Sequence, residues 1–114
     1  LFNKGNHVRD FTYVDDVVEG IKLILRKPPK GEVPFDIFNI ASGNPKSLKY
    51  FLRVIENKLN IKSQKKLKSM QKGDVYKTHA SIRKMNKKFK YKPKFDIVSG
   101  ISSFVDWYRN YFNK

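Results

Sequence analysis

Cysteine is absent from the 114-residue sequence, and this absence excludes disulfide bonds and thiolate metal sites. The two histidines, His7 and His79, are far apart in the sequence, and neither stands near other potential ligands or an obvious carboxylate partner. We therefore predict structural roles for both and no metal site. Apolar runs are too short to span a bilayer and the amino end lacks the features of a signal peptide, so we expect a cytoplasmic protein with no membrane partner.

Self-contained catalytic motifs are also missing. The sequence has no nucleophile elbow, no phosphate-binding P-loop and no pair of metal-binding histidines on one helix. None of the six glycines falls in a dinucleotide-binding fingerprint, and no tyrosine has a lysine four residues later. The sequence begins with Leu1 inside patterned sequence, so we expect a fragment of a longer protein that is inactive alone and binds no cofactor by itself.

What the chain does contain is enough apolar and aromatic sequence, 39% and 14%, for one globular domain over residues 1–114. The net charge of +15 is concentrated in the second half of the sequence. Such a charge attracts phosphates, and a basic nucleic-acid-binding module is therefore an alternative function. Lysine greatly outnumbers arginine, the better base reader, and the lysines are scattered over several elements, so we favour a solvated surface and no nucleic-acid partner.

Residue spacing in the first half predicts two strands and two helices. A strand is expected around residues 8–14, followed by a helix that Asp15 or Asp16 caps and that ends before Pro28. Residues 35–40 are typical of a short buried strand that stops at the turn over residues 42–45. Ser47 is then the expected cap of an amphipathic helix over residues 48–59.

The second half predicts a weaker strand and two more helices. Residues 61–68 alternate mildly and indicate a possible strand before a loop over residues 71–74. Ser81 is the expected cap of a short helix that Pro93 ends, and Asp96 the cap of a final helix. The pattern indicates a mixed α/β fold.

One stretch has a specific family resemblance. Residues 9–21, RDFTYVDDVVEGI, resemble the RDFTYVDDIVEGI stretch of the UDP-glucuronate 4-epimerases, which belong to the extended short-chain dehydrogenase/reductase family. Three further segments resemble that family in the same order: residues 38–45, residues 70–78, and the GISSFVDWY of residues 100–108. The resemblance covers essentially the whole chain.

This resemblance implies the carboxy-terminal, substrate-binding portion of an extended Rossmann-type fold, with the dinucleotide-binding portion absent. The strand near Phe38 is then expected to complete the Rossmann sheet of that other portion. The complete protein is expected to be a cytoplasmic homodimer that holds NAD and converts UDP-glucuronate to UDP-galacturonate for surface polysaccharide. Another nucleotide-sugar epimerase or dehydratase of the same family is the alternative.

The resemblance also implies a set of substrate-binding residues and no catalytic residue. Arg9 is expected to contact the diphosphate, because its planar guanidinium offers paired donors, or else to form an ion pair with Asp10 or another carboxylate. The main chain at Phe2 and Asn3 is expected to pair with the uracil ring. Gln71 and Asp74 form the second anchor.

The residues of that second anchor carry more specific expectations. Asp74 is expected to accept hydrogen bonds from the ribose or to orient a cationic neighbour. Gln71 stands where galactose epimerases carry arginine, which favours the glucuronate enzymes. Lys72 and Ser81 depart from the family pattern, where proline and aspartate are usual.

Overall fold

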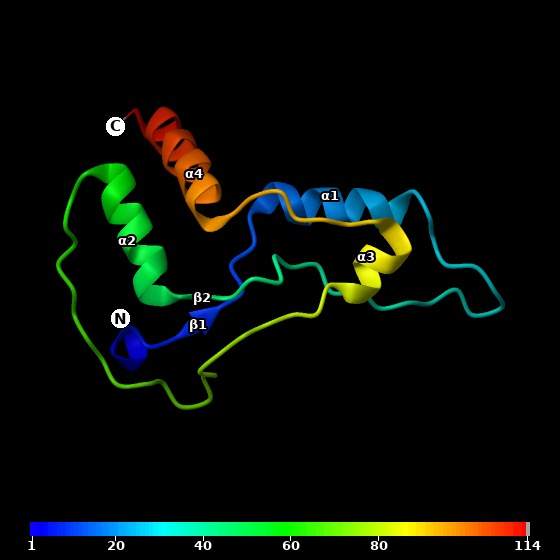
Figure 1. Cartoon of the computed structure of the whole chain (residues 1–114), viewed down its shortest axis with the longest axis horizontal. Coiled ribbons are helices and arrows are strands. Elements are labelled where there is room, and N and C mark those ends of the chain that lie inside the picture. Colours follow the sequence, from blue (N-terminus) through cyan, green and yellow to red (C-terminus); the bar gives the residue numbers. More distant parts are fainter. Residues whose placement is uncertain (114) are drawn as a thin grey trace.

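The computed structural model describes residues 1–113, which form four α-helices joined by long loops and two very short strands (Figure 1). A 3-10 turn, η1, spans Phe2–Gly5 and precedes strand β1. The remaining elements are β1 (Val8–Arg9), α1 (Val14–Leu25), β2 (Lys46–Ser47), α2 (Leu48–Leu59), α3 (Arg83–Phe89) and α4 (Ile97–Phe112). The expected α/β class is confirmed. No helix of these residues is long and apolar enough to cross a bilayer.

Strand β1 lies between two segments that are distant in the sequence. On one side it pairs with β2 in antiparallel register, Val8 opposite Ser47 and Arg9 opposite Lys46. On the other side Val8 forms a parallel bridge with Lys77. The Val8 amide donates to the Tyr76 carbonyl at 3.0 Å, and the Val8 carbonyl accepts from the amide of residue 78 at 3.1 Å. The residues just before and just after β1 therefore lie next to the loop of residues 60–82.

The larger hydrophobic core lies between α2 and α4, which stand side by side in Figure 1. Its buried and partly buried members are Tyr50, Phe51, Val54, Ile55, Leu59, Ile97, Ile101 and Val105. Both helices begin at the predicted caps: the Ser47 hydroxyl accepts from the Tyr50 amide at 3.1 Å, and the Asp96 carboxylate accepts from the Ser99 amide at 2.8 Å. The hydrogen bond from the Ser99 amide lowers the pKa of Asp96, because it stabilises the charged carboxylate.

A smaller core lies where α1 and α3 meet the segment before β2. Met85 and Tyr91 are almost completely buried there. The Tyr91 hydroxyl donates to the Ala41 carbonyl at 3.3 Å, and burial raises the pKa of this phenol. Gly20 lets α1 approach Ile40 closely, since a Cβ at this position would lie only 2.9 Å from Ile40 Cγ2.

The molecule is more extended than its length suggests. Its radius of gyration is 17.2 Å and its extents are 55 × 37 × 20 Å, whereas a compact domain of about 110 residues has a radius of gyration of about 13 Å. Much apolar surface stays exposed, including four residues on one face of α1: Val14, Val18, Ile21 and Leu25. The helices therefore bury only part of the apolar surface that the sequence supplies.

Three expected strands are wrong or much shortened. Residues 35–40 form no strand, and Phe35 and Ile37 are 72% and 65% exposed. An apolar extended segment becomes a buried strand only beside a hydrogen-bonding neighbour, and the described residues supply none here. The strand expected over residues 8–14 shrinks to Val8–Arg9, because β2 pairs with only those two residues. Residues 61–68 form no strand, although the Lys68 backbone bonds to Leu1 and Lys4 at 2.9 and 3.0 Å.

Two expected helix caps are also wrong. Helix α1 begins at Val14 and has no side-chain cap, because the Asp16 carboxylate is buried and accepts from the backbone amides of Lys94 and Phe95 instead. Helix α3 begins at Arg83 after Ile82, and no side chain caps it, so Ser81 does not have the expected role. In both cases the polar residue lies in or near the first turn but outside the capping geometry.

Candidate functional site

The Arg9 guanidinium joins β1 to the loop after α2. Its Nη1 donates to the carbonyls of Val8 and Tyr76, each at 3.0 Å, and its Nη2 donates to Asp74 Oδ1 at 2.9 Å. The ion pair left open by the sequence is therefore formed with Asp74 and not with Asp10. Three of the five guanidinium N–H groups are engaged, which leaves Nε and one N–H of Nη2 without a partner among the described residues.

Asp74 stands at the end of a tight turn. Its amide donates to the Gln71 carbonyl at 3.3 Å, and Gly73 adopts a φ of +80°, which a side chain would disfavour. Asp74 Oδ1 also accepts from the Val75 amide at 2.8 Å, while Oδ2 lies 3.3 Å from His7 Nε2. Of the two roles expected for Asp74, it orients a cationic neighbour in this structure; the contact to a ribose stays a prediction.

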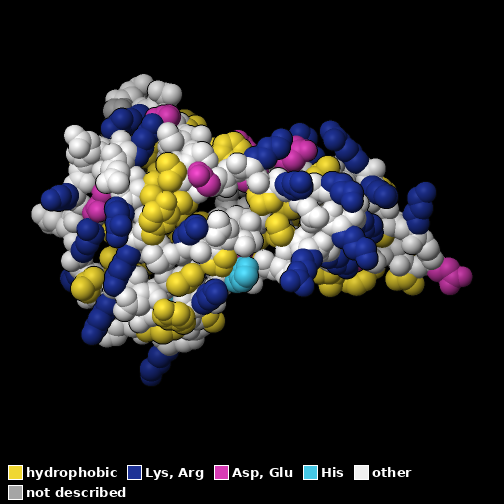
Figure 2. Space-filling view, viewed as in Figure 1, with side chains coloured by type: hydrophobic (Ala, Val, Ile, Leu, Met, Phe, Trp, Pro, Cys, Tyr) yellow, Lys and Arg dark blue, Asp and Glu magenta, His cyan; other side chains and the backbone are white. Residues whose placement is uncertain are grey.

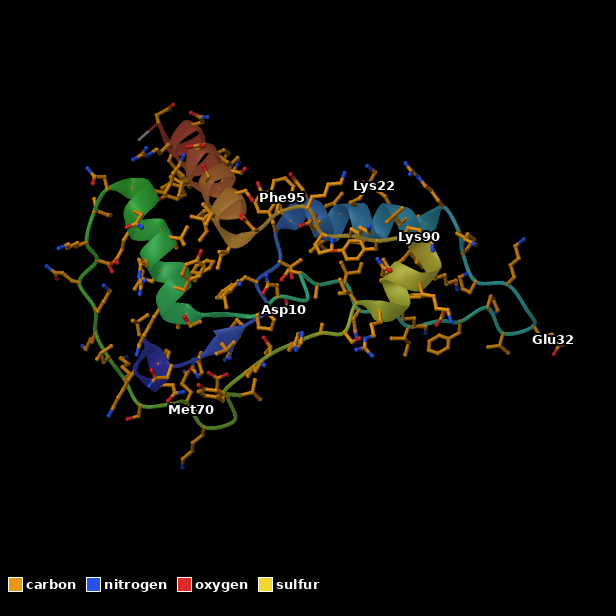
Figure 3. The ribbon with its side chains drawn as sticks, viewed as in Figure 1. Asp10, Lys22, Glu32, Met70, Lys90 and Phe95 are labelled. Carbon is orange, nitrogen blue, oxygen red and sulfur yellow. The ribbon has the colours of Figure 1, made fainter. Side chains whose placement is uncertain are left out.

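Phe2 and Asn3 lie in η1, next to the loop that carries Gln71. Asn3 has left-handed backbone angles, φ 48° and ψ 34°, and its carbonyl accepts from the Asn6 amide at 2.8 Å. Phe2 is 38% exposed, and the Lys68 ammonium lies 5.6 Å from the centre of its ring. Figure 3 shows the loop around Met70 passing beside η1. All five predicted residues therefore gather around η1 and β1, although among residues 1–113 no hydrogen bond or ion pair joins Phe2 or Asn3 directly to Arg9.

Asp10 supports the same region from the neighbouring position. Its carboxylate accepts from the Ser42 hydroxyl at 2.6 Å and from the amides of Gly43 and Ala80 at 3.2 and 3.1 Å. Its own amide donates to the Thr78 hydroxyl at 3.1 Å. Arg9 and Asp10 thus hold successive stretches of one loop. Neighbouring residues of an extended segment point to opposite sides, so Arg9 reaches residues 74–76 while Asp10 reaches residues 42, 43 and 80.

His7 was missed by the sequence reasoning. We expected no carboxylate near it, yet its side chain is buried, 4% exposed, and faces Asp74. Its partner is remote in the sequence, so residue spacing could not reveal the contact. His79, in contrast, is exposed.

The basic side chains are spread over the molecule. Figure 2 shows Lys and Arg at both ends of the visible face, between hydrophobic patches, without one continuous stripe. Several are paired: Lys84 and Lys88 both contact Asp36 and hold the pKa of that carboxyl at about 2. The distribution agrees with the scattered arrangement expected from the sequence.

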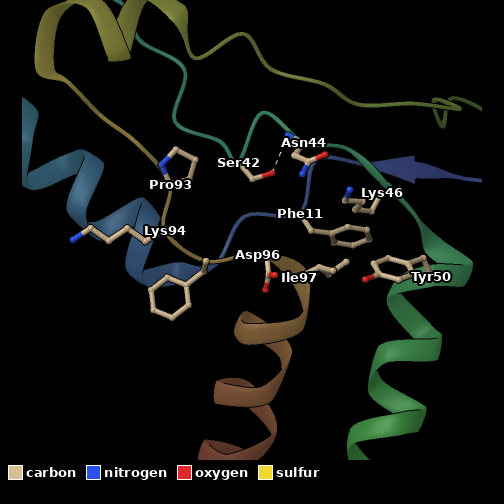
Figure 4. A pocket seen from close by; sticks show the side chains of 10 residues that line it. Phe11, Ser42, Asn44, Lys46, Tyr50, Pro93, Lys94, Asp96 and Ile97 are labelled. Atoms are coloured by element: carbon tan, nitrogen blue, oxygen red, sulfur yellow. Dashed lines mark hydrogen bonds between the residues drawn. The ribbon is translucent and has the colours of Figure 1, made fainter.

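Two pockets lie elsewhere, around the amino ends of α2 and α4. One of about 350 Å³ is lined by Phe11, Ser42, Asn44, Lys46, Tyr50 and residues 93–97 (Figure 4). A more apolar one of about 530 Å³ lies beside it, between the start of α1 and the helices α2 and α4. Neither is lined by Phe2, Asn3, Arg9, Gln71 or Asp74. We place the candidate site at Arg9, outside both pockets, because directional cationic donors are what an anionic ligand requires.

Known proteins resemble this chain in sequence and in fold. The model of the NAD dependent epimerase/dehydratase family matches residues 1–41. UDP-glucuronate 4-epimerase 4 of Arabidopsis thaliana is 33% identical over 99% of this chain and 29% of its own length. The chain spans about a third of the length of the curated relatives it matches.

Two solved structures share the fold. UDP-glucuronic acid 4-epimerase of Bacillus cereus, in complex with UDP-glucuronic acid and NAD, is 23% identical; it superposes with a TM-score of 0.86 over 97% of this chain and 35% of its own. UDP-glucose 4-epimerase of Thermotoga maritima, with UDP-glucose, is 26% identical, with a TM-score of 0.86 over 98% of this chain and 35% of its own.

The fold is thus that of one portion of the Rossmann-type short-chain dehydrogenase/reductases that act as epimerases and dehydratases. Within that class the sequence resembles the NAD-dependent epimerase/dehydratase family, whose model matches residues 1–41.

Proposed function

We propose that this chain is the carboxy-terminal, nucleotide-sugar-binding portion, residues 1–114, of an NAD-dependent UDP-glucuronate 4-epimerase. The observation that carries the proposal is the bond between Arg9 and Asp74, whose partners are 65 residues apart. It brings the loop of Gln71 and Asp74 against β1, beside the η1 turn of Phe2 and Asn3. The residues expected to hold the uracil, the ribose and the diphosphate therefore lie in one region.

Arg9 is suited to a diphosphate in both geometry and charge. Its two unengaged N–H groups can donate to phosphate oxygens, and its three existing bonds hold the guanidinium plane in place. The surrounding loop adds the exposed Lys68 and Lys72. Since Asp74 offsets the charge of Arg9, the lysines of this loop supply the net positive field.

The choice of UDP-glucuronate rests on relatives and on one position. Proteins named as UDP-glucuronate 4-epimerases match nearly the whole chain. Gln71 in the turn favours the same substrate, since galactose epimerases resemble this chain less at that position. The fold similarity to a UDP-glucose 4-epimerase keeps another nucleotide-sugar epimerase as the second candidate. Turnover of UDP-glucuronate against UDP-glucose by the full-length protein distinguishes the two.

NAD does not fit the residues of this chain. A dinucleotide cradle needs a glycine-rich turn that leads directly from a strand into a helix. Among the described residues, the glycines with positive φ at positions 5, 31, 43 and 73 all lie in turns or loops without that context. We therefore infer that the complete protein holds NAD through another portion. We also propose that the complete protein is a cytoplasmic homodimer that takes part in polysaccharide synthesis.

Substitution of Arg9 tests the proposal in the full-length protein. Charge-assisted hydrogen bonds contribute about 1.5–3 kcal/mol, so Arg9→Ala should weaken UDP binding by about tenfold to a hundredfold. Arg9→Lys should restore only part of the affinity, because an ammonium cannot reproduce the planar fork. Arg53→Ala is the matched control, since Arg53 is exposed on α2, away from this region.

Isothermal titration with UDP measures these affinities, and NAD binding should barely change in any variant. If Arg9→Ala stays folded and binds UDP as tightly as the parent, Arg9 is only an ion-pair partner of Asp74 and the phosphate position is wrong. Tight, sequence-selective binding of DNA or RNA at physiological salt would instead favour the nucleic-acid module.

A further inference from the structure

His7 is a buried imidazole with an unusual environment. Its backbone is fixed, because the His7 carbonyl accepts from the Leu48 amide at 2.8 Å. Its side chain is buried, and Nε2 has no well-aligned hydrogen bond among the described residues. Asp74 Oδ2 lies 3.3 Å from His7 Nε2. A buried polar atom without a partner costs about 1–3 kcal/mol, so this arrangement calls for a compensating role.

The Asp74 carboxylate is divided between two cationic or potentially cationic groups. Oδ1 receives Arg9 Nη2 at 2.9 Å and the Val75 amide at 2.8 Å, while Oδ2 faces His7. Arg9 and Asp74 alone sum to zero charge. With a protonated His7 the cluster carries one positive charge, and the carboxylate is held from both sides.

We propose that His7 is a positioning residue of the UDP-sugar site, which acts through Asp74 on Arg9. The proposal rests on the proposed function. When His7 is neutral, the Asp74 charge repels an incoming diphosphate beside Arg9. When His7 is protonated, it offsets that charge, and the two unengaged Arg9 N–H groups bind the ligand at lower cost. Binding of the UDP-sugar and uptake of a proton by His7 are therefore coupled.

Other charged groups around His7 do not produce the same effect. Lys77 lies opposite Val8 in the parallel bridge, and Lys46 of β2 lies opposite Arg9 of β1 in the strand register. Lys49 of α2 donates to Asn6 Oδ1 at 2.7 Å. Lysine side chains ordinarily keep their charge between about pH 5.5 and 8, and carboxylates theirs, whereas histidines ordinarily change charge in this range. A change of affinity with pH in this window therefore reports on histidine.

The test measures the dissociation constant of UDP-glucuronate for the full-length protein from pH 5.5 to 8. This ligand is preferable to UDP, because a terminal phosphate itself titrates near pH 6 whereas the internal diphosphate of a UDP-sugar does not. Protonation of one group changes affinity by at most tenfold per pH unit, and we expect binding to tighten by roughly threefold to tenfold at the acidic end. His7→Gln keeps an N–H donor but no charge and should bind with a flat pH profile. His79→Gln alters the exposed histidine and should behave as the parent.

The outcomes separate this inference from the function. If the parent binds UDP-glucuronate with an affinity that does not change with pH, His7 does not have the proposed role, and the UDP-sugar site is unaffected by this result. A His7→Gln profile as steep as that of the parent also overturns it. Absence of UDP-glucuronate binding at every pH, in a folded parent, overturns the function itself. If His7→Gln fails to fold, NMR of the His7 ring in the parent at a fixed pH decides: saturating UDP-glucuronate should increase the protonated fraction of the ring, and an unchanged fraction refutes the coupling.

Discussion

Replacement of Asp16 tests how α1 is joined to α4 in this fold. Its side chain is 3% exposed, and its two oxygens accept from the amides of Lys94 and Phe95 at 2.8 and 3.1 Å. Those amides stand just before α4, so Asp16 joins the start of α1 to the start of α4. Replacement by alanine removes both bonds and leaves two amides without partners.

The magnitude follows from those two bonds. A hydrogen bond to a charged group contributes about 1.5–3 kcal/mol, so Asp16→Ala should lower the free energy of unfolding by about 3–6 kcal/mol. Asp16→Asn keeps one oxygen acceptor but turns an N–H donor toward an amide that also donates. Asp16→Asn should therefore lower the free energy of unfolding by at least about half as much as Asp16→Ala does. Such losses are large beside a typical stability of about 5–15 kcal/mol.

Urea unfolding of the full-length protein, followed by circular dichroism, measures the effect. Asp15→Ala is the matched control, because Asp15 is an exposed carboxylate in the same helical turn. If Asp16→Ala and Asp15→Ala unfold at the same urea concentration, Asp16 is not the link between α1 and α4, and the reasoning fails.

Two further predictions concern acid stability and helix packing. The hydrogen bond from the Ser63 hydroxyl and, as the next largest cause, the hydrogen bond from Lys65 lower the pKa of Glu56 to about 2. The stabilisation it gives is therefore present above the unfolded pKa, about 4.5, and is lost as pH falls toward 2; Glu56→Gln should flatten that loss in acid unfolding curves, and an unchanged curve would contradict the pairing. Gly20→Ala places a Cβ 2.9 Å from Ile40 Cγ2, and overpacking of about 1–3 kcal/mol should outweigh the gain in helix propensity of about 1 kcal/mol. Thermal unfolding measures it; Ile40→Val should recover part of the loss, and a Gly20→Ala variant as stable as the parent would refute the close packing.

The sequence by itself determined the elements whose signals are local. Ser47 and Asp96 precede amphipathic helices with the right cap chemistry, and both caps formed where the residues predicted. The α/β class and the resemblance to the epimerase family also followed from the sequence, because the motif of residues 9–21 is long and the other segments follow it in order. Arg9 was named as a site residue from that motif and Asp74 from the segment of residues 70–78, and their role toward a ligand stays a prediction.

Only the tertiary structure decided the contacts between distant segments. The apolar pattern of residues 35–40 cannot become a strand without a neighbour to accept its hydrogen bonds, so its periodicity alone was misleading. Asp16 binds a backbone segment 78 residues away instead of capping its own helix, and His7 meets Asp74 across 67 residues. No local pattern encodes such partners, because a carboxylate finds its hydrogen-bond donors in space and not along the chain.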